Sequence, residues 1–166
     1  MVVSFIRYVA VILAALSLGL AFSHLLEIDG KLRLDAETWL AVQQQLYVGS
    51  GMVGIAVQFG AAAAAALLAW MLRHRYLVLG LTLAATICLI AQLGVWLLVN
   101  QPIDADTGRW TAQTLPVNWH DYRNAWEAAH VSRAGLDFLA LTALVVGLLV
   151  EGERLPARRL AAERSA

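Results

Sequence analysis

The amino-acid sequence predicts an all-α fold, an integral membrane four-helix bundle. Of its 166 residues, 60% are hydrophobic and only 14% are charged, and the mean hydropathy is +0.67. Soluble domains carry about 25% charged residues. The apolar residues fall into four runs, and about 20 apolar residues suffice for a helix to cross a bilayer. The formal net charge is zero, so the composition predicts no nucleic-acid partner.

Residues 5–26 form the first predicted span. Arg7, two serines and the terminal His24 are its polar residues. Arg7, the apolar run and the small residues at 21–23 resemble a secretory signal peptide with its cleavage site. The run is nevertheless long enough to cross a bilayer, so we interpret it as a span that is retained.

A charged connector at 27–34 separates the first span from a long second helix. Asp35 is the expected N-cap of that helix, which we predict over 36–72. Its first part is amphipathic and is expected at or above the membrane surface, and its second part, 52–72, is the second span. The small residues 49–51 between the two parts predict a kink.

The third span is predicted at 77–99 and is followed by an irregular loop at 100–117, which contains two prolines and a glycine. The last helix begins near residue 118, and its membrane span is 136–150. The remaining residues, 153–166, are charged and include Pro156, a helix breaker. Residues 1–152 are therefore expected to form one four-span domain.

The positive charges predict the topology. The short turn at 73–75 holds two arginines and no acid, and the tail holds four more arginines, whereas the other two connectors carry more acids than bases. The positive-inside rule places the basic segments in the cytoplasm, and the acidic connectors then face the opposite side of the membrane. Both termini are thus expected on the cytoplasmic side of a bacterial inner membrane, and the extended ends of helices two and four on the periplasmic side.

A polar stripe enters the fourth span. Read as a helix, residues spaced by 4, 3, 4, 3 and 4 share one face within an arc of roughly 80°. Ionisable side chains in a membrane span are costly, so they are candidate functional residues. The members of the stripe are Trp119, Arg123, Trp126, His130, Arg133 and Asp137.

The topology brings further polar residues to the same end of the bundle, where we predict a pocket. His130 and His24 are the candidate acid–base groups, and Arg123 and Arg133 would stabilise an anion. The predicted substrate-binding residues are Trp119, Trp126, Asn100, Gln44 and Asp137. Two structural alternatives stay open: Arg133 and Asp137 have the spacing of an ion pair, and the tryptophans on either side of Arg123 suit cation–π stacking.

The histidines also permit a bound cofactor. His24, Glu27 and His130 could hold a single metal ion, or one or both histidines could ligate a haem. A di-iron centre needs about four carboxylates, more than the bundle core offers. The sequence leaves three alternatives open: no cofactor, a haem or a single metal.

Two stretches carry a family resemblance. The first runs from His24 through Glu27 into residues 39–44. The second has N-x-P-I-D at 100–104 and W-x-x-x-R-x-x-W-x-x-x-H-x-x-R at 119–133. Together they resemble the anthrone-oxygenase-like family of small four-span membrane proteins, most of which have no assigned function. Asp104 departs from the family pattern, which has asparagine there.

The resemblance implies oxidation of a polycyclic phenolic compound by O₂. The first hypothesis is therefore a membrane-embedded oxygenase-like oxidoreductase that acts on a lipophilic aromatic or quinone-like molecule. The second is a non-catalytic module that binds haem, metal or a lipophile, or an accessory subunit. Membrane lipid and a lipophilic small molecule are the expected partners, and small residues in the second span permit a homo-oligomer.

Overall fold

The computed structural model describes residues 1–47 and 50–163, with side chains at 1–47 and 51–152. All regular structure in this part of the chain is helical. Four helical segments are long and apolar enough to cross a membrane, which confirms the predicted all-α integral membrane fold. The four segments are Val2–Lys31, Gly51–Met71, Tyr76–Thr107 and Trp119–Gly152.

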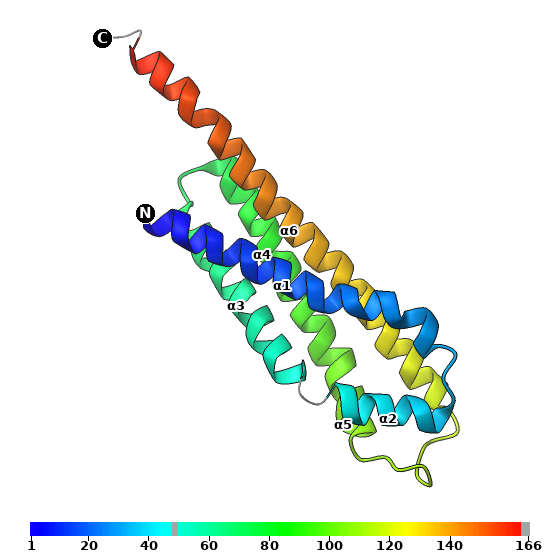
Figure 1. The fold of residues 1–166 in the computed structure, drawn as a ribbon. Coiled ribbons are helices and arrows are strands. Elements are labelled where there is room, and N and C mark those ends of the chain that lie inside the picture. The colour runs from blue at the N-terminus through cyan, green and yellow to red at the C-terminus, as the bar shows by residue number, and fades with distance from the viewer. Residues whose placement is uncertain (48–49, 164–166) are drawn as a thin grey trace.

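Four long helices run side by side, and two short ones lie at one end of the bundle (Figure 1). Helix α1 packs against α3 and α6, and α4 packs against the same two helices. The N-terminus and the turn between α3 and α4 lie at the end opposite the short helices, and α6 extends beyond the bundle there. The α-helices are α1 (Val2–Lys31), α2 (Ala36–Leu46), α3 (Ser50–Met71), α4 (Tyr76–Val95), α5 (Gln101–Thr107) and α6 (Trp119–Glu163).

Small side chains let α1 and α3 approach closely. Ala61 and Ala65 of α3 are fully buried, and a Cβ added at Gly60 would lie 3.2 Å from Leu13 Cδ1 of α1. Close packing of this kind holds helices together where lipid supplies no hydrophobic drive. Gly51 differs, because a Cβ added there would meet nothing within 4 Å.

The first helix is longer than the sequence predicted. Helix α1 continues to Lys31, so most of the expected connector at 27–34 is helical. The residues after Lys31 form the turn into α2, and Asp35 caps α2 as predicted by accepting a hydrogen bond from the backbone N–H of Thr38 at 2.9 Å. The added turn carries Glu27 and Lys31 to the site described below.

Two further helix boundaries differ from the prediction. The expected helix over 36–72 is two helices, α2 and α3; Gly49 of the predicted kink lies outside the described residues. The expected loop at 100–117 begins with helix α5, whose Pro102 lies in the first turn, where the missing N–H costs nothing. A π-helix, Trp96–Asn100, joins α4 to α5.

The opposite end of the bundle is held by charges. Glu151 of α6 forms ion pairs with Arg7 of α1 and with Arg75 at the start of α4. Beyond it the backbone of α6 stays helical to Glu163, so the break expected at Pro156 does not occur. A proline removes one backbone hydrogen bond, which can leave the helix continuous.

Candidate functional site

A cavity of about 380 Å³ lies at the end of the bundle that α2 and α5 cover. Helices α1, α2, α3, α5 and α6 contribute to its wall, and the π-helix after α4 contributes Trp96 and Asn100. An inserted π turn re-aims the side chains that follow it, and such turns are frequent at functional sites. The lining residues that matter below are Leu20, His24, Gln43, Gln44, Tyr47, Ile55, Gln58, Trp96, Asn100, Asp104, Trp126, His130 and Arg133.

Two histidines from different helices stack on each other in this cavity. The ring centroids of His24 on α1 and His130 on α6 are 3.9 Å apart, and the ring planes differ by 33°. Trp126 contacts both, with its centroid 5.0 Å from His24 and 4.1 Å from His130. His130 is 6% exposed, and its Nδ1 has no hydrogen-bond partner among the described residues. The cavity thus holds two imidazoles suited to acid–base chemistry.

Arg133 supplies the cavity with a buried positive charge. Its Nε donates to Gln92 Oε1 at 3.3 Å, and one terminal nitrogen donates to Asn100 Oδ1 at 3.2 Å. Asn100 is held in turn by a hydrogen bond from its amide to the backbone oxygen of Trp126. Neutral amides therefore orient the guanidinium, and no carboxylate of the described residues forms an ion pair with it.

Asp104, the position that departs from the family pattern, forms a hydrogen bond in the site. Asp104 of α5 accepts a hydrogen bond from Trp126 Nε1 at 2.8 Å and also lines the cavity. The bond ties α5 to the tryptophan that packs against both histidines. Asp104 is therefore part of the site, although the sequence analysis singled it out only as a departure from a pattern.

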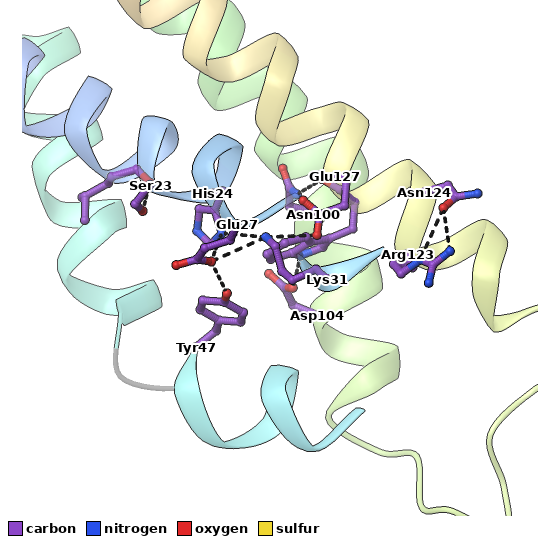
Figure 2. A network of polar contacts seen from close by, with 12 residues as sticks. Ser23, His24, Glu27, Lys31, Tyr47, Asn100, Asp104, Arg123, Asn124 and Glu127 are labelled. Carbon is purple, nitrogen blue, oxygen red and sulfur yellow. Dashed lines mark hydrogen bonds and ion pairs between the residues drawn. The ribbon is translucent and has the colours of Figure 1, made fainter. Parts of the chain in front are cut away.

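An ionic cluster lies beside His24 (Figure 2). The buried Lys31 places its Nζ 3.0 Å from Glu127 Oε1, 3.7 Å from Glu27 Oε2 and 3.4 Å from His24 Nδ1. The same Nζ lies 4.7 Å from the centroid of the Trp126 ring, within reach of a cation–π interaction. Two carboxylates, one imidazole and one aromatic face thus surround the ammonium of Lys31.

Tyr47, the residue after the end of α2, also belongs to the cluster. Its hydroxyl donates to Glu27 Oε2 at 2.6 Å, and its ring centroid is 5.0 Å from that of His24. Burial raises the pKa of Tyr47 above its ordinary value, and the hydrogen bond to Glu27 and the charges of Glu27 and Glu127 raise it further. Tyr47 is therefore a hydrogen-bond donor at neutral pH.

The predicted site residues divide into two groups. Six of them line the cavity together: His24, Gln44, Asn100, Trp126, His130 and Arg133. Arg123, Trp119, Asp137 and Glu27 do not line it. Arg123 donates to the backbone oxygen of Leu32 at 3.0 Å and lies 5.0 Å from the Trp119 ring centroid, so it joins α6 to the turn after α1.

Two pairings expected from spacing are absent. Arg133 and Asp137 form no ion pair, because each has a partner on another helix; Asp137 accepts a hydrogen bond from Ser17 Oγ of α1 at 2.9 Å. Arg123 lies over Trp119 and not over Trp126, whose face is taken by Lys31.

The arrangement does not fit the expected ligand set of His24, Glu27 and His130. Within the described ranges no group of three or more His, Cys, Asp and Glu side chains is placed to hold a metal ion. The two ring centroids are only 3.9 Å apart, which leaves no room for one haem iron between the two imidazoles.

Lys31 is the main residue that the sequence analysis did not assign to the site. His24, Glu27 and Lys31 are spaced by 3 and 4 residues, which is one face of a helix. That signal was hidden by the prediction of a connector at 27–34. Trp96 also lines the cavity, and no charge or motif distinguished it. Comparison of the chain with family models, with curated proteins and with solved structures finds no match.

Proposed function

We propose that this protein is a membrane-embedded oxidoreductase of the oxygenase type that acts on a lipophilic aromatic or quinone-like molecule. One observation carries the proposal: the stacked His24 and His130 share a single cavity with the cationic Arg133, inside a membrane-spanning bundle. A base and a buried cation around one cavity are the groups needed to form and hold an organic anion.

The reaction would start with a proton transfer. His130 takes a proton from a benzylic carbon or a phenolic oxygen of the substrate, and the electron pair stays on the substrate as an enolate or phenolate. Arg133, oriented by Gln92 and Asn100, stabilises this anion. O₂ is the co-substrate and oxidant. When the substrate carries a benzylic CH₂ group, this carbon loses both of its C–H bonds. One oxygen atom of O₂ becomes the carbonyl oxygen, and the other leaves as water with the two hydrogens.

The wall of the cavity suits an aromatic ligand. Trp96, Trp126 and Tyr47 offer aromatic faces, and Leu20 and Ile55 offer aliphatic ones. Binding sites for small molecules are typically apolar with a few converging polar groups, and the volume of about 380 Å³ lies in their usual range. A lipophilic substrate would reach the bundle by dissolving in the membrane.

The proposed location is a bacterial inner membrane with both termini in the cytoplasm. The arginine-rich turn at 73–75 and the end of α6 support it, because both lie at the end of the bundle opposite α2 and α5 (Figure 1), and these two helices line the cavity. The cavity then lies toward the periplasmic side.

A second candidate is a module that binds a lipophile without reaction. Gln43 Nε2 and Gln58 Oε1 favour it: both residues line the cavity, and both atoms are buried without a hydrogen-bond partner among the described residues. Amide groups of this kind bind carbonyl or hydroxyl groups of a ligand, and binding alone requires no base.

The test uses protein purified in mild detergent and 1,8-dihydroxyanthrone as substrate. O₂ uptake and anthraquinone absorbance are recorded, and the rate without protein is subtracted because anthrones oxidise spontaneously. We expect His130→Ala to lower the rate by about 10² or more, and His74→Ala, in the exposed turn between α3 and α4, to leave it unchanged.

Two results would contradict the oxidoreductase. One is a His130→Ala variant that is well folded and as fast as the wild type. The other is tight binding of the anthrone with no O₂ uptake above the blank, which supports the binding module. An ultraviolet–visible spectrum and a metal analysis of the same preparation identify any haem or metal that the protein carries.

A further inference from the structure

Lys31 contacts only one of the two stacked histidines. Its Nζ lies 3.4 Å from Nδ1 of His24, and no described side chain forms a hydrogen bond with Nδ1 of His130. Lys31 is 4% exposed and is held in place by Glu127 at 3.0 Å and Glu27 at 3.7 Å (Figure 2). The two rings are therefore in different electrostatic surroundings although their centroids are only 3.9 Å apart.

The contact determines which nitrogen of His24 carries hydrogen. A lysine ammonium has three N–H donors and no acceptor, so Nδ1 of His24 must be the acceptor. The hydrogen of the neutral ring is then on Nε2, because one ring nitrogen donates and the other accepts.

Glu27 would favour the opposite tautomer, in which Nδ1 carries the hydrogen. Its Oε2 is 3.9 Å from His24 Nδ1, farther away than Lys31 Nζ at 3.4 Å. The same oxygen already accepts the Tyr47 hydroxyl at 2.6 Å. Lys31 is thus the nearer partner of Nδ1, and Glu27 is engaged elsewhere.

We propose that Lys31 is a positioning residue that holds His24 as the Nε2–H tautomer and so gives the two histidines different roles. Because Nδ1 is bonded to Lys31, a ligand in the cavity meets His24 through Nε2–H, a donor. The consequence for catalysis rests on the proposed function: the substrate's proton goes to His130, and the oxygen that keeps the electron pair accepts a hydrogen bond from His24.

The tautomer is measured without any substrate. Protein labelled with ¹⁵N at histidine is studied by NMR in detergent at about pH 8, above the ordinary histidine pKa of about 6.5. The ring nitrogens that do and do not carry hydrogen have well separated ¹⁵N shifts, and the four histidines are assigned by single His→Gln variants. We expect the Nε2–H pattern for His24, and for Lys31→Met a shift to the Nδ1–H form or to an average of the two forms.

A double variant separates the effect on the His24 tautomer from any effect of misfolding. Lys31→Met leaves Glu127 buried without its cation, whereas Lys31→Met with Glu127→Gln removes both charges. The matched control is Arg33→Met, which removes an exposed cation paired with Asp29, away from His24. The double variant should show the same change at His24, and Arg33→Met should show none.

An Nδ1–H pattern for His24 in the wild type would overturn the proposal, and so would an unchanged Nε2–H pattern in a folded double variant. Neither result depends on turnover, so a failure here is distinct from a failure of the oxidoreductase. If 1,8-dihydroxyanthrone is oxidised, the double variant should also lose about tenfold or more in kcat, with the His24 pattern changed in the same sample.

Discussion

Asp137 lies one helical turn after Arg133 on α6, yet its carboxylate accepts a hydrogen bond from Ser17 of α1 instead of pairing with that arginine. Arg133 instead donates hydrogen bonds to the amide oxygens of Gln92 and Asn100. The guanidinium is thereby oriented without being neutralised by a neighbouring carboxylate. A cation in this state is suited to an anionic ligand.

The Ser17–Asp137 contact should contribute to stability. Both side chains are fully buried, and Oδ1 of Asp137 has no hydrogen-bond partner among the described residues. Ser17→Ala removes the donor to the other oxygen of Asp137, so we expect the free energy of unfolding to fall by about 1–3 kcal/mol. The measurement is the thermal midpoint in detergent, which should be lower than in the wild type. Ser23→Ala is the control, because Ser23 is exposed on the same helix and donates only to the backbone of Leu20. Equal midpoints for the two variants would show that the buried bond contributes nothing.

Arg133 should contribute to ligand binding, whereas Arg123 should contribute to the stability of the fold. Arg133→Met removes a hydrogen-bond donor from the cavity, so we expect 1,8-dihydroxyanthraquinone, titrated at a pH where it is ionised, to bind about tenfold or more weakly. Arg123→Met should lower the thermal midpoint and leave the dissociation constant unchanged, because Arg123 contacts Leu32 and Trp119 outside the cavity. Quenching of tryptophan fluorescence measures the binding. Weaker binding in Arg123→Met alone would reverse this assignment.

Local periodicity explains what the sequence could predict. The stripe from Trp119 to Asp137 and the four apolar runs depend on spacing within one helix, and the structure has both helices and stripe where expected. The N-cap at Asp35 is equally local. Such features follow from residues a few positions apart, which a single sequence displays.

Partners from other helices explain what could not be predicted. The i,i+4 rule pairs Arg133 with Asp137, but the packed bundle offers Gln92 and Ser17 as alternatives. The charges at 27–34 indicated a connector, yet Lys31 is helical and buried, and its ammonium forms an ion pair with Glu127, 96 positions further along the chain. Contacts over such separations leave no periodic signal.

Removing one partner of the Lys31–Glu127 ion pair should destabilise the protein far more than removing both. Both side chains are 5% exposed, and an unpaired buried charge costs about 3–5 kcal/mol. We expect Lys31→Met to be strongly destabilised and the added Glu127→Gln change to restore much of the loss. The exposed pair of Arg33 and Asp29 serves as reference, where the same cycle should give less than about 1 kcal/mol. Denaturant unfolding of the four variants of each cycle measures the coupling, and equal couplings would contradict the ion pair.

Tyr47 should be the last tyrosine to ionise. Burial and Glu27 raise its pKa above the ordinary 10.0, so the native state keeps a proton that the unfolded chain releases. The stabilising contribution is complete below pH 10 and is lost as the pH rises above it. An alkaline titration of tyrosine absorbance should show a late step that Tyr47→Phe removes and that Tyr76→Phe, at an exposed position, keeps. A late step that survives in Tyr47→Phe would assign it to another tyrosine.

Gln44 should hold α2 and the end of α5 together where they cover the cavity. Its side-chain amide donates to the backbone oxygens of Thr107 and Trp110, at 2.8 and 2.9 Å, and so joins α2 to the end of α5. Gln44→Ala removes both bonds, and each hydrogen bond of this kind contributes about 0.5–1.5 kcal/mol. Amide hydrogen exchange in residues 108–117 should therefore become several-fold faster, while exchange within α3 and α4 is unchanged. Gln45→Ala is the matched control, since Gln45 is exposed on the same helix and should leave exchange at 108–117 as in the wild type. If the two variants exchange alike in this segment, Gln44 contributes to the wall of the cavity and not to its closure.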